Sequence, residues 1–314
     1  MEFFKHNTAI NFMGQRWRCG FLSLILFILS LMAIWMYGLN LGLDFTGGTQ
    51  VQVHYATAPE LNDVRSALSK AGINDAVVQD YGSAQDVLIT LRTLQYQASK
   101  ETNERLLQQQ TANTIRQALP TATLQQVNYI GPTIGHELAS KGVLAIIVAM
   151  IGTMIYIAMR FEYRFAISST LALVHDPILI LGVFAFWQIP FDMVTLAALL
   201  MVIGYSLNDT IVVFDRVREN FRKLRNGTAL EIMNASINQT LSRTIMTSLL
   251  TFLAVLSLYL FGGPVLHGFA LAFLIGIIIG TYSSIYIAGA LAIAFGLERK
   301  DLLPAERKYA DDRP

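Results

Sequence analysis

Six long apolar runs dominate the chain, and a polar segment, residues 39–141, separates the first run from the other five. Each run has at least 18 residues, enough for a helix to cross a hydrocarbon core of about 30 Å. No A-x-A cleavage site ends the first run, so we expect an uncleaved anchor rather than a secretory signal. We predict transmembrane helices near Gly20–Gly38, Gly142–Met159, Phe165–Phe186, Met193–Val213, Thr244–Phe261 and Gly268–Phe295.

The segment 39–141 has the pattern of a folded domain outside the membrane. Alternating apolar residues predict four strands, at Val51–Tyr55, Val77–Tyr81, Val87–Leu91 and Thr123–Ile130. One helix is predicted from Pro59 to Gly72 and a second over Ser99–Leu119. The order strand, helix, strand, strand, helix, strand is that of a ferredoxin-like α+β sandwich. The domain has no catalytic constellation, so we expect docking or substrate handling in preference to pure scaffolding or an enzyme activity.

Composition supports a membrane protein and excludes several chemistries. Hydrophobic residues make up 54% of the chain and charged residues 14%, against roughly 25% charged in an average soluble domain. The single cysteine, Cys19, rules out an intrachain disulfide. The five histidines are scattered, no Walker A sequence is present, and the net charge of +1 gives no reason to expect nucleic acid. We expect no metal and no cofactor.

The basic residues predict the orientation. Of the 23 Lys and Arg, 16 fall in the N-terminal tail, the loops after the second and fourth spans, and the C-terminal tail, and the remaining 7 fall in the polar domain. The short turns 187–192 and 262–267 have none. The positive-inside rule then places both termini in the cytoplasm and the domain outside. The predicted organisation is tail and first span 1–38, domain 39–141, further spans 142–297 with a basic loop at 214–243, and tail 298–314.

Three acidic residues lie outside the tails, the loops and the domain: Asp176, Asp192 and Asp209. Asp192 stands at a helix start, where an N-cap explains it. Asp209 interrupts an apolar helix beside Ser206 and Asn208, and an embedded carboxylate costs roughly 2.5–3.5 kcal/mol, which makes function the default hypothesis. Arg243 starts the next span from the same side. A stripe of hydroxyl residues continues along that helix: Thr244, Thr247, Ser248 and Thr251. A proton relay at Asp209 is preferred over a structural ion pair with Arg243.

Asp176 lies near the middle of the third span, between His175 and Pro177. The proline removes a backbone donor and favours a kink. His175 and Asp176 form either a second relay station or a hydrogen bond to a neighbouring helix, and the sequence does not separate these two readings.

Two further patterns concern packing. Small residues recur at every fourth position of the sixth span and predict a close helix contact, internal or with a partner: Ala272, Gly276, Gly280, Ser284, Ala288 and Ala292. In the basic loop, an apolar stripe at Phe214, Val217, Phe221 and Leu224 predicts a helix lying at the membrane interface. Thr228 and Glu231 fit a capping box that opens a second helix.

Several of these segments together resemble one family. The strongest are Gly42–Thr49, Gly204–Asp209, Asp215–Asn220, Leu241–Thr244 and Phe261–Pro264, and the resemblance covers nearly the whole chain. The chain resembles the SecF family, the smaller membrane component of the bacterial SecD–SecF export accessory complex in the resistance-nodulation-division superfamily. Pro177 departs from the aliphatic residue expected there.

The resemblance implies a function and partners. With SecD and the SecYEG channel, the chain would help move unfolded secretory proteins across the inner membrane, with membrane lipid around it and the proton gradient as energy source. Asp209 and Arg243 match positions that the family associates with proton transfer, and Asp176 matches the acidic residue that follows His in the third span. Six helices with an embedded acid look like half of a pseudo-symmetric transporter, and SecD would supply the other half. The alternatives are a proton-driven small-molecule exporter and a passive translocon scaffold.

Overall fold

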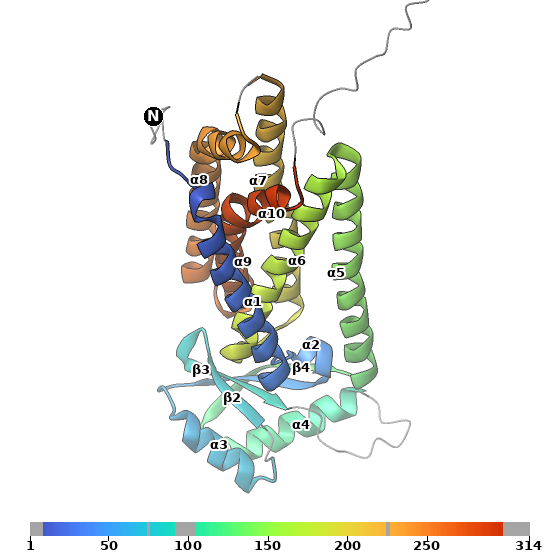
Figure 1. Cartoon of the computed structure of the whole chain (residues 1–314). Helices are drawn as coiled ribbons and strands as arrows, with labels where there is room; N and C mark the ends of the chain where they lie inside the picture. The colour runs from blue at the N-terminus through green and yellow to red at the C-terminus, as the bar shows by residue number, and fades with distance from the viewer. Residues whose placement is uncertain (1–8, 74–75, 92–103, 224–226, 298–314) are drawn as a thin grey trace, which may run out of the picture.

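The computed structural model describes residues 9–73, 76–91, 104–223 and 227–297. Within these residues, six helices are long and apolar enough to cross a membrane. A small domain with a four-stranded sheet lies against one end of the helix bundle (Figure 1). The predicted fold class, six spanning helices with one ferredoxin-like domain, is therefore confirmed.

The spanning helices are longer than their apolar runs. A short 3-10 turn at Met13–Gln15 leads into the first of them, and α9 passes through a π-helical turn at Ser283–Ala288 into α10. The helices are α1 (Arg16–Tyr37), α5 (Pro132–Arg160), α6 (Tyr163–Phe186), α7 (Met193–Lys223), α8 (Ala229–Phe261), α9 (Pro264–Tyr282) and α10 (Gly289–Ala294). Helix α6 continues through Pro177.

The prediction of an interfacial helix in the basic loop is wrong. Helix α7 runs without a break to Lys223, and its stripe residues Phe214, Val217 and Phe221 are buried inside the bundle. The Phe214 ring lies 4.6 Å from that of Phe165 on α6, and the stripe shares a core with residues of α8. A protein surface was available to cover these side chains, so they pack there instead of against lipid. Leu224 lies outside the described residues.

The capping box predicted at the start of α8 is confirmed. Thr228 accepts a hydrogen bond from the backbone of Glu231, and the Glu231 carboxylate accepts one from the backbone of Thr228. These two bonds satisfy backbone donors that a helix start leaves without partners.

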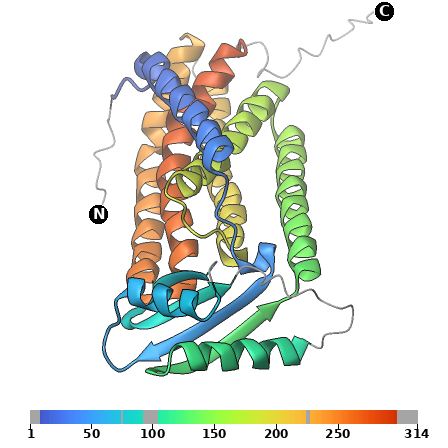
Figure 2. The same cartoon turned by 90° about the horizontal axis from the view of Figure 1, so that it is seen from below.

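The domain has the predicted ferredoxin-like order. Its sheet runs β2-β3-β1-β4 with all neighbours antiparallel, and α3 and α4 cover the face away from the bundle (Figures 1 and 2). Alternate strand residues such as Val51, Val53 and Ile89 form its core with Leu68 of α3 and Ile115 of α4. The elements are β1 (Gly48–Tyr55), α3 (Leu61–Lys70), β2 (Ala76–Tyr81), β3 (Ser83–Leu91), α4 (Glu104–Ala118) and β4 (Ala122–Ile130). The first residues of the predicted second helix, 99–103, lie outside the described residues.

The glycine-rich segment 42–49 connects α1 to the first strand of the domain. It forms a one-turn helix, α2 (Leu43–Thr46), whose Asp44 accepts a hydrogen bond from the backbone N–H of Met193 at the start of α7, at 3.0 Å. Gly48 has φ +132°, and a Cβ there would lie 2.4 Å from the carbonyl oxygen of Leu91. Gly48 thus lets the start of β1 approach the end of β3 more closely than a residue with a Cβ could.

Candidate functional site

Two carboxylates lie buried inside the bundle, Asp176 on α6 and Asp209 on α7, with 1% and 3% of their surface exposed. The third acidic residue outside the tails, loops and domain, Asp192, accepts a hydrogen bond from the backbone N–H of Thr195 at 2.7 Å, so its interpretation as an N-cap is confirmed. Since an ionised group inside a membrane is costly without partners, the surroundings of the two buried carboxylates define the candidate site.

Asp209 faces α8. The Ser248 hydroxyl on α8 donates to its Oδ2 atom at 3.4 Å. Ser248 also lies 2.8 Å from the Thr281 hydroxyl on α9, just before the π-helical turn. The carboxylate of one helix is therefore joined to two others by a short chain of hydroxyl groups, each of which can both donate and accept a hydrogen bond.

The expected neighbours of Asp209 on α8 are placed differently. Arg243 is exposed, and within the described part of the chain it forms no ion pair with Asp209. The Thr247 hydroxyl donates to backbone carbonyl groups of its own helix, those of Arg243 and Thr244, at 3.0 Å each. Ser248, the next residue in the predicted hydroxyl stripe, makes the contact instead.

Asp176 belongs to a second polar cluster. Its Oδ1 atom lies 2.9 Å from Nδ1 of His175, and its Oδ2 atom accepts a hydrogen bond of 2.5 Å from the Ser206 hydroxyl on α7. The other ring nitrogen of His175 is bonded to the Ser23 hydroxyl of α1. Asp176 and its neighbour thus join α1, α6 and α7. Ser23 is not among the predicted site residues, although it is a hydroxyl within an apolar run.

The two clusters are adjacent along α7 but face different helices. Ser206, which donates a hydrogen bond to Asp176, precedes Asp209 by about one turn. The Ser206 backbone carbonyl accepts from Ser284 of the π-helical turn at 3.3 Å, and Ser284 lies 2.9 Å from the Thr210 hydroxyl. Asn208 points outward and is exposed. Helix α7 therefore carries both Asp209 itself and Ser206, the hydroxyl donor to Asp176.

The stripe of small residues on α9 lies against this same helix. A Cβ added at Gly276 would lie 2.3 Å from a methyl group of Val202, and one at Gly280 would lie 3.0 Å from Cβ of Ser206. Ala272, Ser284, Ala288 and Ala292 continue the stripe and are buried. Close approach of α9 to α7 brings Thr281 and Ser284 to the two clusters.

A further cleft, of about 1220 Å³, lies between the sheet and the ends of α7, α8 and α9 that face it. Its sheet side presents uncharged polar groups, including Gln50, Gln79, Gln126 and Asn128, and its bundle side presents Tyr259 among others. Among its described lining residues, acidic groups occur and Lys and Arg do not. Across the described ranges, no group of three or more His, Cys, Asp or Glu is placed to hold a metal ion.

We expect Ser206→Ala to destabilise the protein, because it leaves a buried Asp176 oxygen without its donor. Loss of such a partner costs roughly 1–3 kcal/mol, which should lower the midpoint of thermal unfolding in lipid nanodiscs. Ser257→Ala is the matched control, since the Ser257 hydroxyl is exposed and bonds only to its own helix. Equal midpoints for the two variants would contradict a role for Ser206 in holding Asp176.

The fold and site define a class: a polytopic α-helical membrane protein with buried carboxylates between its helices and a ferredoxin-like domain seated on one end. Two family descriptions match the chain, "Protein export membrane protein SecD/SecF, C-terminal" over residues 110–298 and "SecD/SecF GG Motif" over residues 33–59. The chain belongs to the SecD/SecF family of protein export membrane proteins.

Similar proteins agree with this assignment. The chain is 45% identical over 307 residues to the protein translocase subunit SecF of Pseudomonas aeruginosa, covering 98% of each. It is 45% identical over 308 residues to that of Vibrio alginolyticus, covering 97% of this chain and 96% of the other. The crystal structure of SecDF, a translocon-associated membrane protein from Thermus thermophilus, matches 93% of this chain with a TM-score of 0.81 and 37% identity. This chain spans 39% of that longer protein.

Proposed function

We propose that this chain works with SecD as a membrane subunit that uses the proton motive force to assist export of secretory proteins through SecYEG. The observation that carries the proton-coupled part is Asp209, a carboxylate with 3% of its surface exposed. It accepts a hydrogen bond from the Ser248 hydroxyl of α8, which is itself bonded to the Thr281 hydroxyl of α9. A carboxylate of this kind can change charge inside the membrane, and one proton crossing 100 mV releases roughly 2.3 kcal/mol.

A partner subunit is supported by polar groups that this chain leaves uncovered at membrane depth. Asn208 and Arg243 are both exposed. Asn208 lies roughly 22 Å along α7 from Met193, and Arg243 lies about 27 Å along α8 from Phe261, at about 1.5 Å per residue. Both distances fall within a hydrocarbon core of about 30 Å. Since a guanidinium facing lipid there is costly, SecD is proposed to cover this region of α7 and α8.

The proposed setting is the bacterial inner membrane with both termini in the cytoplasm. The start of α1 and the end of α10 lie at the end of the bundle away from the sheet (Figure 1), together with the basic residues of α7. The domain is then outside, and its cleft of about 1220 Å³ opens where an exported chain emerges. A lining of amides, apolar side chains and a few acidic groups, with no Lys or Arg among its described residues, suits an unfolded polypeptide of varied sequence.

Complementation tests the proposal. The chain and its own SecD are produced in cells depleted of the native SecD and SecF, and export of a secretory precursor is followed by pulse-chase. We expect export to recover, and the gain to disappear when a protonophore dissipates the gradient. The chain without SecD should give no recovery. Failure to restore export, although both subunits accumulate and co-purify, would overturn the proposed function.

A further inference from the structure

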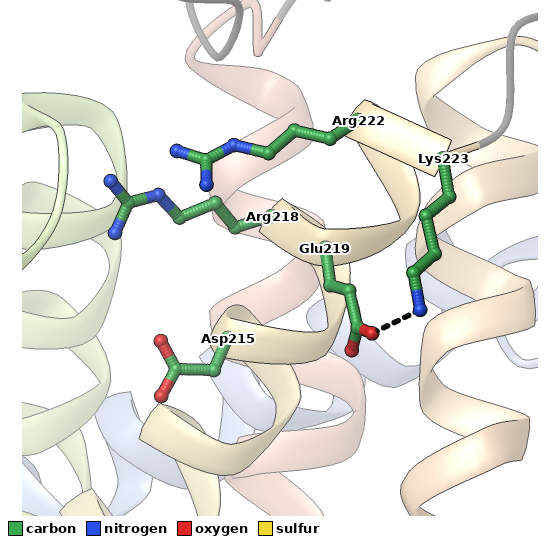
Figure 3. A pocket seen from close by; sticks show the side chains of 5 residues that line it. All are labelled: Asp215, Arg218, Glu219, Arg222 and Lys223. Carbon is green, nitrogen blue, oxygen red and sulfur yellow. Dashed lines mark hydrogen bonds and ion pairs between the residues drawn. The ribbon is translucent and has the colours of Figure 1, made fainter.

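A small charged cavity lies at the end of α7 that is away from the sheet. It has a volume of about 360 Å³ and is lined by Asp215, Arg218, Glu219, Arg222 and Lys223, which follow one another along the last two turns of the helix (Figure 3). None of these side chains takes part in the two carboxylate clusters, so the cavity calls for a separate explanation.

Both acidic residues of the cavity are already paired with cations. Asp215 accepts a hydrogen bond from Arg160, at the end of α5, at 2.6 Å. Glu219 holds two cations of its own helix, Arg216 at 2.9 Å and Lys223 at 2.5 Å. The acidic groups are therefore occupied, and they do not neutralise the remaining two arginines.

Arg218 and Arg222 form no ion pair within the described ranges of the chain. They stand four residues apart on one helix, and both side chains extend to the same side of it (Figure 3). Like charges at this spacing repel each other in an isolated helix. An anion placed between the two guanidinium groups would turn this repulsion into attraction.

The position of the pair indicates which anion. The ion pair of Arg160 with Asp215 ties α7 to the point where α5 ends and α6 begins, which marks the membrane surface on this side. Arg218 lies one turn beyond that level and Arg222 a second turn, roughly 5 and 10 Å further along the helix. This is the depth of the phospholipid headgroups, which extend several ångströms beyond the hydrocarbon core.

We propose that Arg218 and Arg222 bind the phosphodiester group of an anionic phospholipid in the leaflet opposite the folded domain. Guanidinium groups match phosphate oxygens in fixed, often bidentate geometry, and basic residues beside a spanning helix attract anionic lipid. A lipid is favoured over free phosphate because its tails hold the phosphate at this depth, whereas a soluble anion would have to be concentrated there. The site is independent of the proton-coupled function proposed above.

Native mass spectrometry of the full chain in complex with SecD tests the site. The complex is titrated with phosphatidylglycerol and, separately, with phosphatidylcholine. For Arg218→Gln combined with Arg222→Gln, we expect the apparent dissociation constant for the first phosphatidylglycerol to rise on the order of tenfold, with phosphatidylcholine binding unchanged. The matched control is Arg216→Gln combined with Lys223→Gln, which removes the same charge from the same helix end but from cations that are already paired.

Three results would overturn the proposal. An equal loss in the control variant would mean that net charge alone attracts the lipid. Unchanged phosphatidylglycerol binding in the test variant would remove the site. Displacement of the lipid by millimolar inorganic phosphate would assign the pair to a soluble anion. Retained binding in the control together with the tenfold loss in the test variant would support the lipid site.

Discussion

Replacement of Asp209 with asparagine is expected to reduce export to the rate of cells that lack the chain, while the protein still accumulates and binds SecD. Asparagine has nearly the same shape and can still accept the hydrogen bond from Ser248, but it cannot take up and release a proton near neutral pH. The proton gradient can then no longer be coupled to movement of α7. Pulse-chase of a secretory precursor in cells depleted of the native subunits measures the effect.

Asp192→Asn is the matched control for this experiment. It makes the same chemical change at the start of the same helix, where the side chain caps α7 through Thr195, and asparagine caps a helix about as well as aspartate. We expect normal export from it. If Asp209→Asn also exports at the normal rate, Asp209 is a packing residue, and a passive scaffold explains the chain better than a proton-coupled subunit.

The position of Asp209 could be found from the sequence, but its partner could not. A run of polar residues inside an apolar helix singles out the carboxylate because hydrocarbon penalises it wherever the helix is placed. The choice between Thr247 and Ser248 depends on rotation of α8, since adjacent helical residues point about 100° apart. That rotation is set by packing against α7 and α9, which one sequence does not specify. The Asp176 cluster could not be predicted for the same reason, because Ser23 reaches His175 and Ser206 reaches Asp176 only when α1 and α7 both pack on α6.

The elements were more predictable than their ends. Period-two alternation identified the four strands, and length with apolarity identified the six spans, because both signals are local. The continuation of α7 beyond Val213 was missed because a stripe such as Phe214, Val217 and Phe221 serves equally well for lipid or for a neighbouring helix. The contact of Asp44 with the start of α7 joins residues 149 positions apart, so no local sequence pattern predicts it.

Replacement of Gly276 with leucine is expected to cause the largest loss of stability among the glycine positions of α9. A Cβ there would lie 2.3 Å and 2.7 Å from the two methyl groups of Val202, and Val202 is fully buried, so it has little room to turn away. The helices must separate, at a cost of about 1–3 kcal/mol or more for overpacking. The separation would also pull Thr281 away from Ser248 and Gly280 away from Ser206. The midpoint of thermal unfolding in nanodiscs and the export rate should both fall.

Two comparisons isolate the cause. Gly152→Leu adds the same side chain to α5, where no atom lies within 4 Å of the new Cβ, and should leave the unfolding midpoint nearly unchanged. Val202→Ala in the Gly276→Leu background makes room for the leucine and should recover part of the loss. If Gly152→Leu and Gly276→Leu are equally stable, close contact between α7 and α9 is not required. Recovery by Val202→Ala would show instead that the small residues of α9 keep α7, and with it Asp209, within reach of the hydroxyl groups on its neighbours.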